Sequence, residues 1–535
     1  MLKRFTNLKL ITGSTNPLET SDFQGENFLG EGPFDELWVD ELGYICSAAP
    51  QSPHEVLDLA GQVVLPTFAD RHAHPVLAGR EMLSAKITDA ASIAEIISRL
   101  KEFLALKPEV TLIVAGSYDR NLVADGRFEA AWLDEVSNDI PIVLHANDHH
   151  TIWVNTAGLK LAGLLNSDGA NAKLPETGIG SIDVDQNGRP TGVLREDEAK
   201  HLVLSRIEKP AEAENLQALL AAQEQLLSWG ITKVTDAYVD DEIALTYLNA
   251  IEGHALAIHF ELLFAVTPKD FANQITNALA WRNRLESLPQ SHVRLSGIKI
   301  FADGVLGSAT AAVRDSYFDS RGEPNGNHGD LIWSELELEN ALVAAATAGL
   351  DVHIHAIGDA AIDQIVQVCN QSKLKPHITV AHAELADIEQ LTTLAKAGIT
   401  VNFQPLWARP DAMMHSCAVQ LGNERVQGLY RHRSALACGL ALEFGSDWPV
   451  SDANPLLGIY TAVFRRVPGS VEAHNLAEAI SATEALRIYR SNNLAVGNRA
   501  DFCTIEGEVI SKPELLATAK VTQTFIGGQP MLTRQ

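Results

Sequence analysis

Eight short apolar segments, separated by stretches with helical periodicity, run through the chain from residue 63 to residue 446. They lie at 63–69, 231–239, 255–264, 293–302, 350–357, 377–383, 399–404 and 440–446. Strands that alternate with helices pair in parallel, because each helix returns the chain to the same edge of the sheet. Eight such units are the number that closes a (β/α)8 barrel, a TIM-type α/β fold. We therefore predict such a barrel for residues 67–489.

Two further regions fall outside this repeat. Residues 1–66 and 490–535 contain short β-type runs bounded by turn residues, and we predict that both ends of the chain build one small β-sandwich domain. Residues 76–210 are too many for a single helix between the first two barrel strands. Since loops that follow barrel strands lie on the catalytic face, this insertion is expected to cover the active site.

The charge and the cysteines narrow the class of protein. With 68 acidic and 41 basic residues, the formal charge is −27, which argues against nucleic acid or an anionic membrane as a partner. The five cysteines are scattered and show no paired spacing, as expected in a reducing compartment. We see no signal peptide and no apolar segment of membrane-spanning length, so we expect a cytoplasmic protein.

Polar residues with metal-ligand chemistry stand at or near the ends of the predicted strands. They are His72, His74, Lys299, His355, His382 and Asp447. His72 and His74 are two residues apart, so on a strand both imidazoles face the same side. Imidazole and carboxylate ligands suit divalent zinc, manganese or iron. A lysine ammonium cannot ligate a metal, but a lysine carboxylated by carbon dioxide can bridge two ions.

The amino-acid sequence around these residues resembles that of the amidohydrolase superfamily. The motifs that carry the resemblance are residues 148–155, 299–308, 355–359, 445–449 with 454–455, and 499–501. They are most similar to the branch that includes N-substituted formamide deformylase and YtcJ-like proteins. The similarity extends over nearly the whole chain, including the terminal β domain and the insertion.

The resemblance implies a metal-dependent hydrolase that cleaves the carbon–nitrogen bond of a small non-peptide amide, such as an N-substituted formamide or an N-acyl amine. It implies that His72, His74 and Asp447 hold one ion, with zinc as the expected metal. His355 and His382 would hold a second ion, and a carbamate on Lys299 would bridge the two. A site with a single ion remains open at this stage.

The resemblance also assigns roles in catalysis. A metal-activated hydroxide would attack the carbonyl, His150 would polarise the carbonyl oxygen, and Asp447 would carry the proton to the leaving nitrogen. Trp153, Asn155 and Asp303 are expected to contact the substrate. Three other residues are expected outside the ligand set: His353 lies deeper in the barrel, and His149 and His328 are loop residues without a task.

Two alternatives remain open. The same fold could cleave another bond, in a cyclic amide, an ester or an aminated ring. The barrel could instead bind a metal or ligand in a regulatory role without turnover. The complete ligand set favours the enzyme. The sequence does not reveal the oligomeric state, although a homodimer would be ordinary for this architecture.

Overall fold

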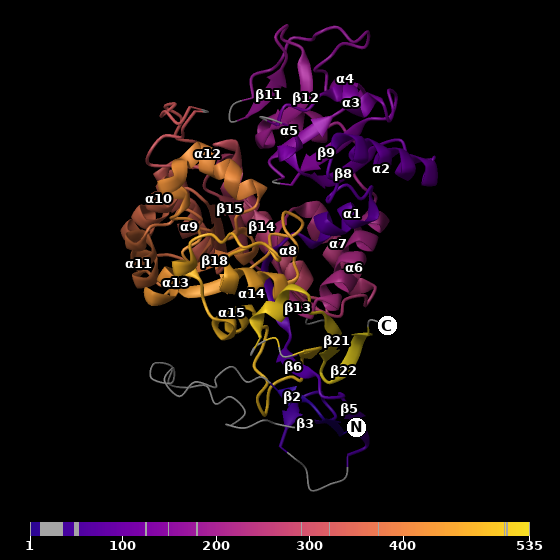
Figure 1. The fold of residues 1–535 in the computed structure, drawn as a ribbon, viewed down its shortest axis with the longest axis vertical. Coiled ribbons are helices and arrows are strands. Elements are labelled where there is room, and N and C mark those ends of the chain that lie inside the picture. The colour runs from indigo at the N-terminus through magenta and orange to yellow at the C-terminus, as the bar shows by residue number, and fades with distance from the viewer. Residues whose placement is uncertain are drawn as a thin grey trace.

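The computed structural model describes residues 2–10, 36–47, 53–123, 126–147, 149–177, 180–289, 292–319, 321–372, 374–507, 509 and 512–533. In Figure 1 the chain forms three parts stacked along the long axis, with the insertion at the top, the barrel in the middle and the terminal β domain at the bottom. Both termini lie near the β domain (Figure 1).

The central part is a parallel sheet of eight strands that follow one another in chain order, which confirms the predicted barrel. The strands are β7 (Phe68–Ala73), β13 (Ile231–Val239), β14 (His259–Ala265), β15 (Val293–Phe301), β16 (Asp351–Ala356), β17 (Ile378–His382), β18 (Thr400–Phe403) and β19 (Ala441–Phe444). The first and last strands meet at a seam, where the amide of Asp447 donates to the carbonyl of His72 at 2.6 Å. A parallel bridge between Ala73 and Trp448 continues this seam.

The first predicted strand, at 63–69, is two strands in the structure. Residues Val63–Pro66 form β6 of the terminal domain, where they pair with β20 (Phe502–Ile505), and the barrel strand β7 begins only at Phe68. The apolar run continues across both sheets, so its pattern alone did not mark the boundary. His72 consequently lies within β7, and His74 follows it as the residue before helix α1 (Pro75–Leu83).

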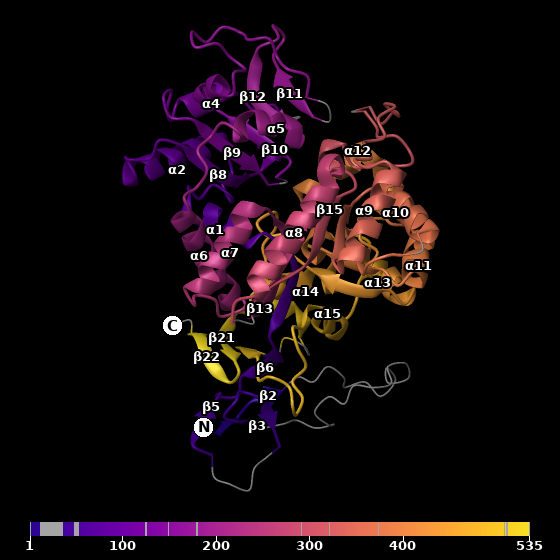
Figure 2. The same cartoon turned by 180° about the vertical axis from the view of Figure 1, so that it is seen from behind.

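Helices surround the barrel strands, as the two opposite views show (Figures 1 and 2). They are α6 (Glu212–Ser228), α7 (Asp241–Glu252), α8 (Phe271–Glu286), α9 (Glu335–Ala348), α10 (Asp359–Gln371), α11 (Ile388–Lys396), α12 (Ala412–Val426), α13 (His432–Ala437), α14 (Pro455–Phe464) and α15 (Ala482–Tyr489). Most of these helices pack their apolar faces on the strands in one core, to which Leu226, Ile298 and Ile365 belong, whereas the buried residues of α12 join a separate cluster with Leu306 and Tyr317. No described helix combines the length and the apolar character needed to cross a membrane.

The insertion has its own five-stranded sheet in the order β11, β12, β10, β9, β8. These strands are β8 (Ile113–Tyr118), β9 (Ile142–Ala146), β10 (Thr151–Val154), β11 (Ser181–Val184) and β12 (Pro190–Arg195), accompanied by α2 (Ile93–Leu106), α3 (Ala130–Asp134), α4 (Thr156–Leu161) and α5 (Glu196–Leu204). Separate apolar clusters, one around Trp153 and one around Val154, place β10 between two small cores. A sheet packed on both faces is rigid enough to position residues at its edge.

Strands from both ends of the chain build the terminal domain. One sheet contains β1 (Lys3–Thr6), β3 (Glu36–Val39), β4 (Ile45–Cys46) and β5 (Glu55–Asp58), and the other contains β2 (Lys9–Leu10), β6, β20, β21 (Val521–Ile526) and β22 (Gln529–Thr533). Phe5 packs edge-on against Phe502 and Phe525, with ring centroids 5.1 and 5.5 Å away. These contacts join the two chain ends through one aromatic cluster.

A buried arginine ties together loops on the barrel. Arg465 is fully buried, and its guanidinium donates to the carbonyls of Leu429, Tyr430 and His474. Burial and the nearby Arg465 charge lower the pKa of His474 to about 4. The folded protein therefore holds His474 neutral at pH values where the unfolded chain binds a proton.

This difference predicts a pH-dependent loss of stability. Above the unfolded pKa of 6.5, His474 is neutral in both states and does not lower the free energy of unfolding. As the pH falls from 6.5 toward 4, the unfolded chain gains a proton that the folded protein does not, so the free energy of unfolding falls. We expect His474→Gln to remove about 2 kcal/mol of the stability loss that the wild type shows between pH 7.5 and pH 5. Urea unfolding at the two pH values measures this difference. An unchanged pH dependence in the variant would show that His474 is not the titrating group.

Candidate metal centre

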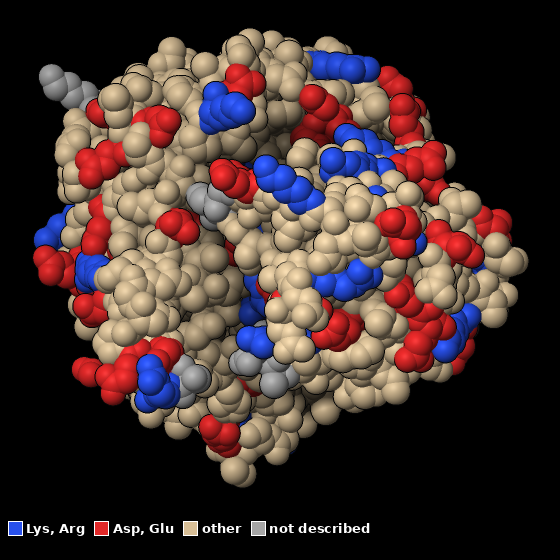
Figure 3. Space-filling view, turned by 90° about the horizontal axis from the view of Figure 1, so that it is seen from above, with Lys and Arg blue, Asp and Glu red and all other residues tan. Residues whose placement is uncertain are grey.

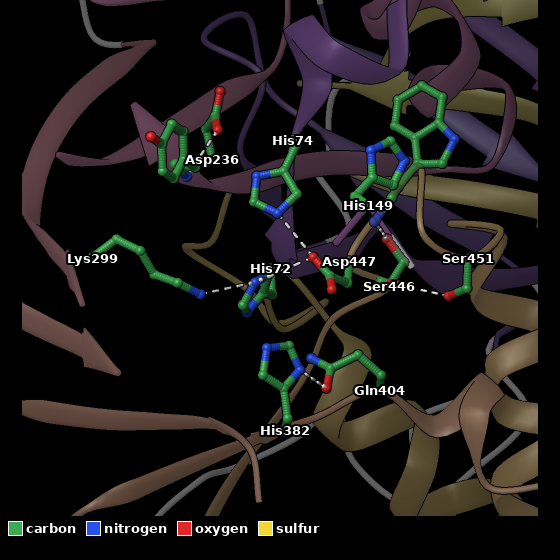
Figure 4. Close-up of polar contacts among 12 residues, drawn as sticks. His72, His74, His149, Asp236, Lys299, His382, Gln404, Ser446, Asp447 and Ser451 are labelled. Atoms are coloured by element: carbon green, nitrogen blue, oxygen red, sulfur yellow. Dashed lines mark hydrogen bonds and ion pairs between the residues drawn. The ribbon is translucent and has the colours of Figure 1, made fainter. Parts of the chain in front are cut away.

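Three candidate ligands converge at the seam that closes the barrel. Nε2 of His74 lies 2.8 Å from Oδ1 of Asp447, and Nε2 of His72 lies 3.4 Å from the same oxygen. One ligand atom from each of these residues lies within 4.8 Å of the other two. Figure 4 shows Lys299, His72 and Asp447 side by side, with His74 above them and joined to Asp447. This separation leaves room for a cation between two nitrogens and one oxygen.

The other candidate ligands border the same group. Nζ of Lys299 lies 3.2 Å from Nε2 of His72. The His382 ring centroid lies 4.9 Å from that of His72 and 4.6 Å from that of His355. The structure thus brings together all six residues that the sequence singled out, at the carboxyl ends of β7, β15, β16, β17 and β19. Whether they bind metal stays a prediction.

The outer nitrogens of three imidazoles are already engaged by the protein. Nδ1 of His72 lies 2.9 Å from Nε2 of His353, Nδ1 of His382 lies 2.7 Å from Oε1 of Gln404, and Nε2 of His355 lies 2.9 Å from the carbonyl of Gly304. A neutral imidazole that donates from one nitrogen presents a lone pair on the other. Because Oε1 of Gln404 and the carbonyl of Gly304 only accept, the lone pairs of His382 and His355 lie on Nε2 and Nδ1, while either His72 or His353 can be the donor in their shared contact. This arrangement fits metal binding.

Burial sets the protonation of these groups. It lowers the pKa of His382 to about 4 and that of Lys299 to about 7, and it lowers the pKa of His72 and of His355 well below the usual value. Burial alone would raise the pKa of Asp447, but the hydrogen bond and charge of His74 lower it overall. Neutral imidazoles beside an ionised carboxylate are the forms that ligate a divalent metal.

A cavity of about 900 Å³ opens over these residues. Seen from above, the molecule is hollowed near the centre of this face (Figure 3). The insertion lines one side with residues such as His150 and Leu204, and residues that include Trp407 and Met413 line another. The indole of Trp407 stacks on His382 with an interplanar angle of 5°. The insertion therefore forms part of the wall around the candidate site.

His150 enters this wall with a carboxylate partner. Its Nδ1 lies 2.8 Å from Oε2 of Glu196, whose Oε1 accepts from the hydroxyl of Thr310 at 2.8 Å. The His150 ring centroid is 6.1 Å from that of His355. Glu196 adopts a φ of 62°, which is uncommon for a non-glycine residue and often marks a functional position. The arrangement fixes the His150 ring close to the candidate ligands.

The three predicted substrate contacts, Trp153, Asn155 and Asp303, lie outside the cavity lining. Trp153 is fully buried and its indole nitrogen donates to the carbonyl of Glu129, while Asn155 is fully buried and caps α4. Both lie in the packed interior of the insertion, away from the cavity. The buried carboxylate of Asp303 accepts from the amides of Ala312, Ile357 and Gly358, and it lies 3.6 Å from His355. Asp148, part of the motif that contains His150, lies outside the described residues.

Several residues of the cavity escaped the sequence analysis. His149 was expected to have no task, yet it lines the cavity and its Nε2 lies 3.0 Å from Oγ of Ser117. Glu384 and Tyr430 also line it and are bonded to each other. Burial raises the pKa of Glu384 to about 7. Asp236 also lines the cavity, and its position as an acidic residue within the apolar run of β13 is visible in the sequence. The contact between Tyr430 and Glu384 has no such signal in the sequence.

A family model and several known proteins are similar to this chain over most of its length. A sequence model of the amidohydrolase family matches residues 55–532. The chain is 29% identical to the protein LONG AFTER FAR-RED 3 of Arabidopsis thaliana over 89% of this chain and 83% of that protein. It is 26% identical to the putative amidohydrolase YtcJ of Bacillus subtilis over 89% of this chain and 90% of that protein.

A third relative bears on the predicted branch. The chain is 25% identical to N-substituted formamide deformylase of Arthrobacter pascens over 90% of each chain. Together with the YtcJ match, this confirms the resemblance found in the motifs. Among solved structures, an uncharacterized metal-dependent hydrolase from Pyrococcus horikoshii superposes with a TM-score of 0.71 at 24% identity, covering 96% of this chain and 99% of that chain. The similarity to this solved structure supports the barrel fold.

The contact between His353 and His72 generates a prediction. Since His353 holds the outer nitrogen of His72, we expect His353→Ala to weaken metal binding by about 10- to 100-fold. Equilibrium dialysis against buffered zinc, with plasma mass spectrometry of the protein, measures this change. His328→Gln, which alters a loop histidine away from the cavity, is the control. Equal zinc affinity in wild type and His353→Ala would contradict the positioning role.

Proposed function

The chain belongs to the amidohydrolase family, and from this premise we propose that it is a metal-dependent hydrolase acting on the carbon–nitrogen bond of a small non-peptide amide. The convergence of His72, His74 and Asp447 beneath the cavity is the observation that carries the proposal. The N-substituted formamide deformylase relative supports an N-substituted formamide or a related N-acyl amine as the substrate class.

The proposed centre holds two divalent ions, and zinc suits the nitrogen and oxygen donors. His72, His74 and Asp447 would hold one ion, and His355 and His382 the other. When bound, the metal supplies Lewis acidity and a water of lowered pKa, so that hydroxide is available near neutral pH. The hydrogen-bonded outer nitrogens of His72, His355 and His382 support these assignments, since they fix the orientation of each ring.

Lys299 supplies the proposed bridge as a carbamate. Its burial lowers the pKa of the amine to about 7, so a large fraction is neutral and nucleophilic at physiological pH. The neutral amine would attack carbon dioxide, form a carbon–nitrogen bond and release one proton. The resulting anionic oxygens would lie near His72, since Nζ of Lys299 lies 3.2 Å from Nε2 of His72.

Two side chains would handle the proton and the carbonyl during hydrolysis. Asp447 would accept a proton and deliver it to the leaving nitrogen, a role suited to a carboxylate that lines the cavity. His150 would donate a hydrogen bond to the carbonyl oxygen, and its contact with Glu196 would hold the imidazole in position. The surrounding wall would limit access of bulk water to the reacting groups.

The metal content of variants tests the proposal. We expect about two equivalents of zinc or manganese in the wild type and less than about one in His72→Ala and in Lys299→Ala. Hydrolysis of N-formyl and N-acyl amines should fall at least about a hundredfold in both variants, because ligand loss removes the reactive centre. Plasma mass spectrometry and amine release measure the two effects.

Matched controls use polar residues of two neighbouring barrel strands that lie outside the cavity lining. Lys233→Ala on β13 removes an ion pair with Glu261, and His259→Ala on β14 removes an imidazole outside the cavity. Both should keep their metal and their activity. One equivalent of metal that survives the loss of Lys299 would replace the bridged centre by a single ion. No bound metal after expression with added zinc and manganese would contradict the hydrolytic function.

A further inference from the structure

A buried carboxylate enters the cavity wall two residues beyond His382. Glu384 is only 5% exposed but lines the cavity. His382 and Ala383 before it adopt φ values of 74° and 43°, which non-glycine residues rarely adopt. The chain therefore turns sharply at the end of β17, and this turn carries Glu384 into the wall. Such a strained turn persists only where surrounding contacts hold it.

Tyr430 fixes the position of this carboxylate. Its hydroxyl donates to Oε2 of Glu384 at 2.7 Å, and its amide donates to the Glu384 carbonyl at 3.0 Å. The carbonyl of Tyr430 in turn accepts from the buried guanidinium of Arg465 at 2.9 Å. Glu384 is consequently held in place on both its side chain and its backbone.

The remaining oxygen of Glu384 has no described partner. Within the described part of the chain, no residue donates to Oε1 and no cation forms an ion pair with this carboxylate. Leu306, Ile357 and Cys417 line the cavity with it, so the surroundings offer little compensation. A buried carboxylate without a cation is costly, and a ligand that supplies the positive charge recovers much of that cost.

The charge of the described cavity lining also favours a positively charged ligand. Seven lining residues are acidic and four are basic; the acidic residues are Asp119, Asp236, Asp240, Glu384, Asp411, Asp447 and Asp452, and the basic ones are Arg80, Lys200, Lys299 and Arg409. Arg80 contacts Glu242, Arg409 contacts Asp411, Lys299 contacts His72 and Lys200 donates to the carbonyl of His149. All four cations thus have protein partners, and none is an ion-pair partner of Glu384.

We propose that Glu384, held by Tyr430, binds a primary ammonium group at the far end of the substrate's amine portion. This inference rests on the proposed function, because it places the scissile amide at the metal centre. The substrate class becomes an acylated or formylated diamine whose aliphatic chain runs along Leu306 and Ile357. Glu384 acts here as a specificity residue and takes no part in bond cleavage.

The experiment compares amines that differ only at the distal end. The metal-loaded, full-length protein is titrated calorimetrically with the mono-methanesulfonamide of 1,4-diaminobutane and with the N-methanesulfonamides of 4-amino-1-butanol and pentylamine. These compounds are not hydrolysed and their sulfonamide nitrogens are uncharged, so only the diamine derivative carries an ammonium. We expect the diamine derivative to bind about 10- to 100-fold tighter than the other two, as a charge-assisted hydrogen bond would require. The ratio of kcat/KM for N-formyl-1,4-diaminobutane over N-formylpentylamine should show the same preference.

Two variants assign the preference to Glu384. Glu384→Gln keeps an acceptor for the Tyr430 hydroxyl but removes the charge, so the preference should fall to about onefold to threefold. Tyr430→Phe should reduce it partly. Glu478→Gln is the matched control, since Glu478 is also 5% exposed but lies outside the cavity lining, and its preference should equal that of the wild type.

The outcomes separate this inference from the function on which it rests. Equal binding of the diamine and pentylamine derivatives by the wild type, or a preference that survives Glu384→Gln, would overturn the ammonium site. Equal binding of the sulfonamide derivatives of 1,4-diaminobutane and 4-amino-1-butanol would also overturn it, because a neutral hydroxyl donor would then suffice. A preserved diamine preference without hydrolysis of any formamide would support the site and refute the proposed function.

Discussion

Closure of the barrel between β7 and β19 is the constraint on which the candidate centre depends. The carbonyl of His72 accepts from the amides of Ser446 and Asp447, and the buried carboxylate of Asp70 accepts from the amide and the hydroxyl of Ser446. A Cβ atom at Gly445 would lie 2.6 Å from the Cβ of His72, so only glycine permits this approach. The same contacts that close the sheet therefore bring Asp447 to the two histidines.

The insertion supplies His150 to the cavity at this face of the barrel. A sheet with apolar clusters on both faces is a firm support, and His150, just before its strand β10, lines the cavity. The unusual φ of Glu196 places a carboxylate against that imidazole, and Thr310 of the barrel completes the contact. The wall of the cavity is thus joined to the barrel through hydrogen bonds that run from His150 through Glu196 to Thr310.

The sequence predicted what local periodicity determines and failed where tertiary packing decides. The two-residue spacing of His72 and His74 and the order of apolar segments predicted a barrel with clustered polar strand ends. Motif similarity does not show which side of a strand meets a cavity, so it did not indicate that Trp153 and Asn155 lie outside the cavity lining, where both faces of β10 are buried. The pair formed by Glu384 and Tyr430, 46 residues apart, depends on how the intervening helices pack.

Buried residues outside the cavity lining hold the residues of the lining in place. Arg465 makes no contact with the candidate ligands, yet it holds the carbonyls of Leu429 and Tyr430, and Tyr430 holds Glu384. His353 holds His72 in the same way from inside the barrel. In both cases a buried polar group meets its own hydrogen-bonding demand by fixing a residue that lines the cavity. The interior polar network is therefore arranged so that stability of the fold and position of the site depend on the same bonds.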